Sequence, residues 1–347
     1  MRNTTRVLYN AMLAQIAQLN GVADAAVKFS ATPSVQQTLE TRIQESSAFL
    51  SQINMIGVRE LAGEKVGITI GSTIASRTDT SGAGVRSPIN VDDTDANGYQ
   101  CKQTDFDTGI PYGLLDAWAK FTDFQTRVRD AIIRRQALDR IMIGFNGLQA
   151  SATTDRATYP LLQDVNIGWL QQYRTHADAR VLDSGAAANV VKIGGTAPDY
   201  ANLDALVMDA VNSLIDPWYQ DDTSLVAIVG RDLLNDKYFQ MVNQDLPPTE
   251  QLAADIIKSK KQLGGLPALR VPFFPTGKIL ITSLSNLSLY WQEEGRRRYL
   301  KEEPEKNRIA NYESSNDAYV VEDYGFGALI ENIQIGDAEE EGGGGGG

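Results

Sequence analysis

The sequence predicts an α+β protein in which one long helix carries a projecting hairpin. Three observations lead to this class. Apolar residues recur every three or four positions from Leu114 to Phe145, with no proline and no glycine before Gly144, which is typical of a helix. Two alternating segments enclose a polar, glycine-containing stretch between Ile56 and Tyr112. After residue 199, helical and strand patterns alternate, and strands then dominate to residue 337.

Composition limits the possible functions. The 347 residues can bury a sizeable core in one elaborated domain or two coupled ones. The formal net charge of −12 argues against general affinity for nucleic acid and suits a protein that stays soluble at high concentration. Cys101 is the single cysteine, so no disulfide can form within the chain, and no apolar run is long enough to span a membrane. We expect a soluble, cytosolic product.

Two amphipathic helices come first in the chain. One is predicted from Thr5 to Asn20, closed by Gly21, and the other from Ser34 to Ile53. A terminal helix joined by a weak linker has too little partner surface to be stable alone. It therefore packs on its own domain, docks on something else, or is removed.

A stretched hairpin is predicted next. Residues 66–76 alternate like a strand, residues 77–98 are polar with several glycines, and residues 99–113 alternate again. The tip has little to bury within its own chain, so it is either a mobile loop or a limb that packs on a neighbour. A neighbouring subunit would also cover its exposed edges.

The long helix follows directly. Four oppositely charged pairs, each four residues apart, line its polar face: Asp116–Lys120, Asp123–Arg127, Asp130–Arg134 and Arg135–Asp139. At about 1.5 Å per residue the helix would be roughly 48 Å long. Taken alone, this periodicity favours an ordinary core helix.

The remaining chain predicts a polar region, an α/β region and a β-rich end. Residues 147–199 are polar, with the end of a helix at Trp169–Tyr173. The later patterns predict helices at 202–215, 231–243 and 249–265, strands at 222–230 and within 266–281, and mostly strands from residue 284 onward. The acidic and glycine-rich residues 338–347 cannot form a core, and we expect them to be disordered.

No motif for catalysis or metal binding emerges. His176 is the sole histidine and is expected on the surface, while Cys101 has no CxxC partner and is expected to face a packed surface. Zinc would need several Cys and His ligands. The adjacent acids Asp92–Asp93 and Asp221–Asp222 are typical of solvated loops, although they leave a calcium site open. We expect no enzyme activity, no cofactor and no metal.

Arg296, Arg297 and Arg298 form the densest basic cluster. Neighbouring glutamates neutralise it, so we interpret it as a site of ion pairing between subunits rather than of nucleic-acid contact. The turn at Gly230, between a strand and a helix, is interpreted as structural because no phosphate-binding motif accompanies it. The four tryptophans are interpreted as core anchors: Trp118, Trp169, Trp218 and Trp291.

Long stretches that together cover most of the chain carry a family resemblance. They include MRNTTRVLYNAMLAQIAQLNGV at residues 1–22, YGLLDAWAKFTDFQTRVRDAIIRRQALDRIMIGFNG at 112–147, and further segments at 28–58, 64–80, 196–234 and 307–333. These segments resemble the major capsid proteins of tailed phages of the P2 family, which have the HK97-like fold. The fold class implied is α+β, with an N-terminal arm, an extended hairpin loop, a long spine helix, a peripheral domain and an axial α/β domain.

The resemblance implies a division of the chain into parts. These are an N-terminal assembly segment that is cleaved off (1–31), an N-arm (32–66), the extended hairpin loop (67–112), the spine helix with part of the peripheral domain (113–198), the axial domain (199–275), a C-terminal β part (276–337) and a disordered tail (338–347).

The implied function is a major capsid protein that forms pentamers and hexamers of an icosahedral head around double-stranded DNA, without sequence-specific contact. Implied partners are an internal scaffold and maturation protease and a portal protein, with assembly in the host bacterial cytoplasm. We place the processing site at Phe29, Ser30, Ala31 and Thr32, as a hypothesis. Contacts between subunits are expected at Arg77, Arg86, Asp92, Asp93, Arg296, Arg297 and Arg298.

The resemblance also raises the question of a covalent crosslink between subunits, and two alternative functions stay open. Some HK97-like shells crosslink through a hairpin lysine, but this sequence has no lysine from Gly67 to Tyr99, and Lys102 lies at the base, so we predict no such crosslink. An encapsulin-like cargo shell of the same fold is one alternative. A carboxylate-dependent hydrolase with the hairpin as a lid is another.

Overall fold

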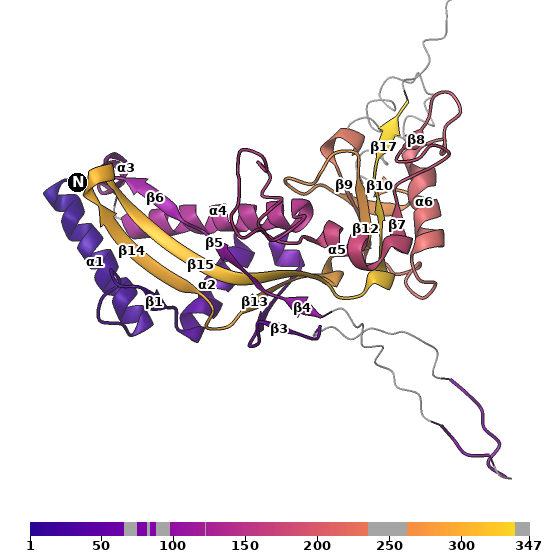
Figure 1. Ribbon diagram of the computed structural model, residues 1–347, viewed down its shortest axis with the longest axis horizontal. Helices are drawn as coiled ribbons and strands as arrows, with labels where there is room; N and C mark the ends of the chain where they lie inside the picture. Colours follow the sequence, from indigo (N-terminus) through magenta and orange to yellow (C-terminus); the bar gives the residue numbers. More distant parts are fainter. Residues whose placement is uncertain (66–74, 82–83, 88–97, 122, 235–261, 337–347) are drawn as a thin grey trace, which may run out of the picture.

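Two β-sheets of different size organise the molecule. The computed structural model describes residues 1–65, 75–81, 84–87, 98–121, 123–234 and 262–336. In Figure 1 the larger sheet lies with the N-terminal helix and the long helix at one end, and the smaller sheet stands at the other end beside α6. The order of strands shows how distant parts of the sequence meet.

The larger, seven-stranded sheet is built around β15 (Arg308–Val321). Because the same residues of β15 pair with both β14 and β6, these two strands lie on opposite edges of β15. By the same register, β13 lies opposite β5. The other members of the sheet are β1 (Phe29–Ser30), β2 (Asn54–Val58), β5 (Lys102–Asp105), β6 (Thr108–Pro111), β13 (Leu287–Gln292) and β14 (Arg297–Glu303).

The smaller sheet has six strands in the order β10-β11-β9-β12-β16-β7. They are β10 (Gln262–Leu263), β11 (Leu266–Leu269), β9 (Leu225–Val229), β12 (Ile279–Ser283), β16 (Gly327–Ile330) and β7 (Val181–Leu182). The amphipathic helix α6 (Leu203–Leu214) packs on this sheet, and the Asn202 side chain caps its start by accepting from Ala205 N at 2.9 Å. Two small ribbons, β3 (Ala62–Gly63) with β4 (Tyr99–Gln100) and β8 (Val191–Ile193) with β17 (Ile333–Ile335), complete the strands.

The other α-helices of the described residues are α1 (Asn3–Asn20), α2 (Pro33–Glu45), α3 (Tyr112–Trp118), α4 (Phe124–Asn146) and α5 (Trp169–His176). Short 3-10 turns lie at Leu50–Gln52, Asp178–Arg180, Leu284–Asn286, Pro304–Lys306 and Tyr324–Phe326. The main core joins α2, α4 and α5 to both sheets through aromatic contacts such as Phe145–Trp169, with ring centroids 5.2 Å apart. Gly144 permits that contact, since a Cβ there would lie 2.2 Å from the Trp169 ring.

The predicted single helix from Leu114 to Phe145 is wrong in one respect, because the structure divides it into α3 and α4. The 23 residues of α4 span roughly 34 Å. Two of the expected pairs form, Arg127 with Asp123 at 2.7 Å and Arg135 with Asp139 at 2.5 Å. Asp116 instead accepts hydrogen bonds from the first helix, and Asp130 pairs with the adjacent Arg129.

Other predicted elements have mixed outcomes. The helices near Thr5–Asn20 and 202–215 and the strands of the β-rich end are confirmed. The second N-terminal helix ends at Glu45 rather than Ile53, and Gln262–Leu263 is strand β10 rather than the end of a helix. Trp218 is 51% exposed and is no core anchor, whereas Trp169 and Trp291 are buried. The predicted strand at 66–76 and helices at 231–243 and 249–265 lie largely outside the described residues.

Candidate functional site

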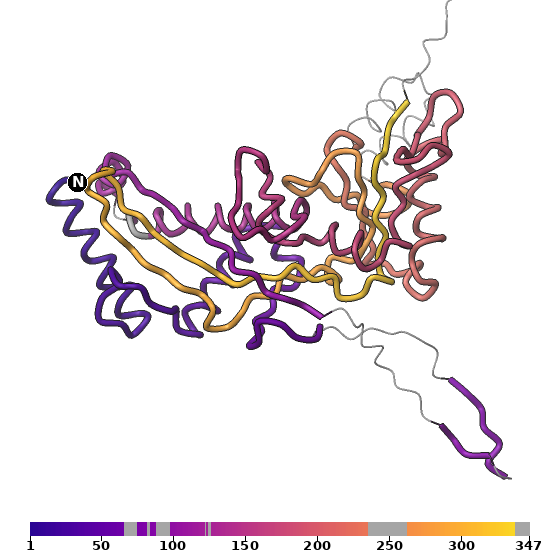
Figure 2. The backbone as a smooth tube through the Cα atoms, viewed as in Figure 1, coloured from indigo at the N-terminus to yellow at the C-terminus, as the bar shows by residue number. Residues whose placement is uncertain are grey.

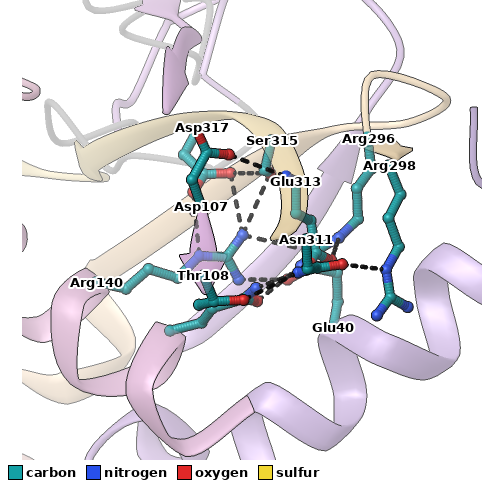
Figure 3. Close-up of polar contacts among 11 residues, drawn as sticks. Glu40, Asp107, Thr108, Arg140, Arg296, Arg298, Asn311, Glu313, Ser315 and Asp317 are labelled. Carbon is teal, nitrogen blue, oxygen red and sulfur yellow. Dashed lines mark hydrogen bonds and ion pairs between the residues drawn. The ribbon is translucent and has the colours of Figure 1, made fainter. Parts of the chain in front are cut away.

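A buried chain of charges joins two helices to the larger sheet (Figure 3). Three carboxylates and two guanidinium groups meet in a space that water hardly reaches, because each residue is at most 4% exposed. The members come from α2, α4, the turn before β14, and β15: Glu40, Arg140, Arg296, Glu313 and Asp317.

The charges alternate in sign along this chain. Arg140 donates to Asp317 through Nε and Nη2, at 3.0 and 3.1 Å, and its Nη1 donates to Glu40. Arg296 donates to the other oxygen of Glu40 at 2.5 Å, and to Glu313 at 2.9 and 2.8 Å. Glu40 therefore bridges both arginines, and acids stand at the two ends.

Uncharged side chains complete the hydrogen bonding. Gln136 donates to Glu313 at 3.0 Å and accepts from Arg296 at 2.7 Å, and Ser315 donates to Asp317 at 2.5 Å. These hydrogen bonds matter because a buried charge without partners destabilises the folded protein. Breaking a buried ion pair costs on the order of 3–5 kcal/mol of stability. The network thus fixes which faces of α2 and α4 meet the sheet.

The pKa values follow from burial and neighbouring charge. Burial raises the pKa of Asp317, and Arg140 opposes the rise. Burial also tends to raise the pKa of Glu313, at the other end of the network. The positive charges of Arg296 and the nearby Arg298 outweigh this effect and lower the pKa to about 2. Burial also opposes ionisation of Glu40, yet its two arginines hold its pKa below the ordinary value.

Local spacing explains how these side chains converge. Gln136 and Arg140 are four residues apart on α4, and Gln36 and Glu40 are four apart on α2, so each pair lies on one helix face. Glu313, Ser315 and Asp317 alternate along β15 and therefore point to the same side of the sheet. The sequence reasoning missed this set. The available signal was polar residues at helical spacing opposite a period-two polar strand.

The expectation for the Arg296–Arg298 cluster needs correction. Arg296 is 1% exposed and is paired with Glu40 and Glu313 of its own chain, so its assignment to ion pairing between subunits is wrong. Successive side chains of β14 point to opposite faces of the sheet, so Arg297 and Arg298 face different sides. Arg298 lies opposite Glu313 and donates to Asn311 at 2.8 Å, on the side of the buried network, whereas Arg297 is exposed.

A groove of about 410 Å³ includes the exposed Arg297 in its lining. Tyr299 and Tyr312 stack in it, with centroids 5.9 Å apart, and Lys28 and Lys301 add positive charge. The other residues that line it are Gln103, Asp105, Asp107, Arg298, Glu313 and Ser314. The groove therefore spans β14, β15, β5 and the residue just before β1.

The hypothetical processing residues form a docked, extended link. Phe29 and Ser30 make up β1, which pairs with Arg298 and Arg297 at the outer edge of β14. The Ala31 amide donates to Arg296 O at 3.0 Å, and Thr32 precedes α2. Before this link, α1 packs on its own chain, with Tyr9 buried in a cluster that includes Leu115, Val128 and Ile309.

The hairpin residues are only partly described. Residues 75–81 and 84–87, which include Arg77 and Arg86, are exposed and lie away from both sheets (Figure 2). Asp92 and Asp93 lie outside the described residues. At the base of the hairpin, Cys101 is buried as predicted, and burial raises the pKa of its thiol to about 12.

Two residues that the sequence singled out for possible chemistry have simple local surroundings. His176 is exposed at the end of α5, as predicted. Asp222 accepts from Ser224 N at 2.7 Å in a local turn. Within the described ranges, no group of three His, Cys, Asp or Glu residues could hold a metal ion, and no helix is both long and apolar enough to cross a membrane.

Comparisons with known proteins agree across nearly the whole chain. Residues 8–333 match the model of the family described as "Phage major capsid protein, P2 family". The chain is 51% identical to the "Capsid proteins" of Escherichia phage P2, over 97% of this chain and 96% of that protein. It is 42% identical to the "Major capsid protein" of Serratia phage KSP20, over 99% and 100%. In the structure titled "Satellite phage P4 procapsid including size determination (Sid) protein", one chain is 48% identical, with a TM-score of 0.82 and coverage of 97% and 99%.

Proposed function

Because the chain belongs to the P2 family of phage major capsid proteins, we propose that it assembles into the pentamers and hexamers of an icosahedral phage head enclosing double-stranded DNA. It is a phage capsid component with the HK97-like fold. The observation that carries the proposal is the fit of nearly the whole chain to a procapsid subunit, at a TM-score of 0.82. Closed shells use one repeated set of interfaces between copies.

The hairpin supplies the limb that such interfaces need. Its described tip residues are exposed and separate from both sheets (Figure 2). A polar limb of this kind packs on a neighbouring subunit. The buried ion pairs that hold α2 and α4 on the large sheet keep the body rigid. We assign the limb to residues 67–112, the axial domain to 199–275 and the spine to α4. The smaller sheet supports an axial domain, although it also recruits β7, β12 and β16 from outside that range.

Contacts between subunits are proposed at the hairpin residues Arg77, Arg86, Asp92 and Asp93, and at Arg297 and Arg298 on β14. No covalent crosslink is expected, since the hairpin from Gly67 to Tyr99 contains no lysine. Heating purified particles in detergent under reducing conditions should therefore release monomers of uniform mass. A ladder of linked subunits would contradict this.

We propose that an internal scaffold guides assembly and that a maturation protease cuts within Phe29–Thr32, in the host cytoplasm, before the head joins a portal and fills with DNA. The support is local. The link there is extended, as proteases require, and Ser30 is exposed. The elements on its two sides are held separately, α1 by its apolar cluster and α2 by Glu40.

Two measurements test the proposal. Electron microscopy of the chain expressed with its neighbouring genes should show closed shells, and a uniformly monomeric product would refute it. N-terminal sequencing of DNA-filled particles should begin between Ser30 and Pro33. A sequence that starts at Met1 would refute the processing step alone.

A further inference from the structure

The groove beside β14 holds three exposed positive charges. Lys28, Arg297 and Lys301 are exposed, and in the described part of the chain none of the three has an ion pair. Most other cations around the large sheet do, as Arg6 with Glu302 and Arg308 with Glu303 show. The chain carries 44 acidic and 32 basic residues, so a second copy has acidic groups in excess to offer these three cations.

The rest of the lining is suited to a peptide. The stacked Tyr299 and Tyr312 offer an apolar surface with hydroxyl groups, and Ser314 offers another. On the far rim, Asp105 and Asp107 already accept hydrogen bonds, from Gln103 at 2.9 Å and from Glu313 N at 3.2 Å. A volume of about 410 Å³ accommodates a few side chains.

These observations favour a protein partner over nucleic acid. A DNA duplex brings a continuous row of phosphates, one charge per roughly 1.7 Å of axis, which Asp105 and Asp107 would repel. An acidic peptide can place single carboxylates against the cations and turn amide groups toward the rim. A strongly acidic protein presents such surfaces on each of its own copies.

We propose that this groove is the docking site for an acidic segment of a second copy of the chain, and that Lys28 strengthens the contact only while residues 1–31 are attached. The inference rests on the proposed self-assembly and adds a named receptor surface to it: Lys28, Arg297, Tyr299, Lys301 and Tyr312. Lys28 directly precedes β1, so cleavage after this strand removes one of the three cations and the cover on the edge of β14. Processing therefore weakens this contact while other contacts persist.

The test compares two variants of equal charge. Arg297→Gln with Lys301→Gln removes two groove cations, and Lys120→Gln with Arg134→Gln removes two exposed cations from elsewhere. Self-association of the purified chains is followed by sedimentation velocity at 50 and 500 mM salt. At low salt, the groove variant should need about tenfold more protein to assemble than the control variant. At high salt, the difference between the concentrations that the two variants need should become smaller.

Lys28→Gln alone should cause a smaller loss of self-association than the double groove variant, because it removes one groove cation instead of two. All variants should unfold at the same temperature as the parent, since no described intrachain ion pair is removed. If the groove and control variants assemble alike, the inference is overturned. It is also overturned if the groove variant loses binding only to a 20-base-pair DNA duplex. If the parent and the control stay monomeric, the proposed function itself fails.

Discussion

Glu40 connects the two arginines of the buried network, because its carboxylate accepts hydrogen bonds from both Arg140 and Arg296. Replacing it by Gln leaves two buried guanidinium groups short of negative charge. We expect the free energy of unfolding in urea to fall by about 3–5 kcal/mol, since this is the typical cost of breaking a buried pair.

Glu45 on the same helix provides the control. It is exposed and pairs with Arg42 at 3.8 Å, so Glu45→Gln should leave the urea midpoint nearly unchanged. Equal midpoints for Glu40→Gln and the parent would show that α2 is not held by these charges.

Glu313 makes stability depend on pH. Its pKa is about 2 in the folded protein, against an ordinary value near 4.3, so its contribution is present above the ordinary value and is lost as pH falls toward 2. The raised pKa of Asp317 acts oppositely, adding stability at low pH that is lost as pH rises through it. Glu313→Gln should therefore be less stable than the parent at pH 6.

The difference between the two proteins should shrink as pH is lowered from about 5 to 2.5, as measured by chemical denaturation at each pH. Parallel stability curves for parent and variant would contradict the assigned role of Glu313.

Single residues also show the limit of prediction from sequence. The run Arg296–Arg298 has the composition of a surface cluster, but β-alternation and the turn before β14 send Arg296 into the interior and leave Arg297 outside. The spacing of Gln36 and Glu40 alone does not show that Glu40 is buried, because its charge is compensated by Arg140, 100 residues away. The burial of Cys101 and the exposure of His176 were predictable, since each has a plain local context.

Among the elements, the contact between α4 and α5 depends on one glycine. An added Cβ at Gly144 would lie 2.2 Å from the Trp169 ring, and that ring is fully buried. We expect Gly144→Ala to lower the free energy of unfolding by about 1–3 kcal/mol, although alanine favours the helix.

Gly113 in α3 is the matched control, since nothing lies within 4 Å of its added Cβ. Gly113→Ala should keep or slightly raise the melting temperature. If both substitutions shift the melting temperature equally, close packing of α4 on Trp169 is not the cause.

Elements with strong local patterns were predictable, and their junctions were not. The period of α6 and the alternation of the last strands appear directly in the sequence. The break between α3 and α4 does not, because it contains neither proline nor glycine. Just before the break, α1 docks on α3, with Asp116 accepting from Thr5 Oγ1 at 2.6 Å, a tertiary contact over 111 positions.

The whole molecule consists of a rigid body, held by contacts within the chain, and a projecting limb that we expect to contact other copies. Buried charges and aromatic packing tie α2, α4 and α5 to the large sheet within one chain. The described residues of the limb and the cations of the groove beside β14 are exposed, and we expect other copies of the chain to cover both. The domain boundaries were less predictable, since the small sheet collects strands from 181–182 to 327–330.

A cryo-EM map of assembled particles tests this account most directly. We expect residues 67–112 of each subunit to lie across a neighbouring subunit, with the body around Glu40 and Arg140 unchanged between positions in the shell. A map in which the hairpin folds back on its own body and touches no neighbour would contradict the account.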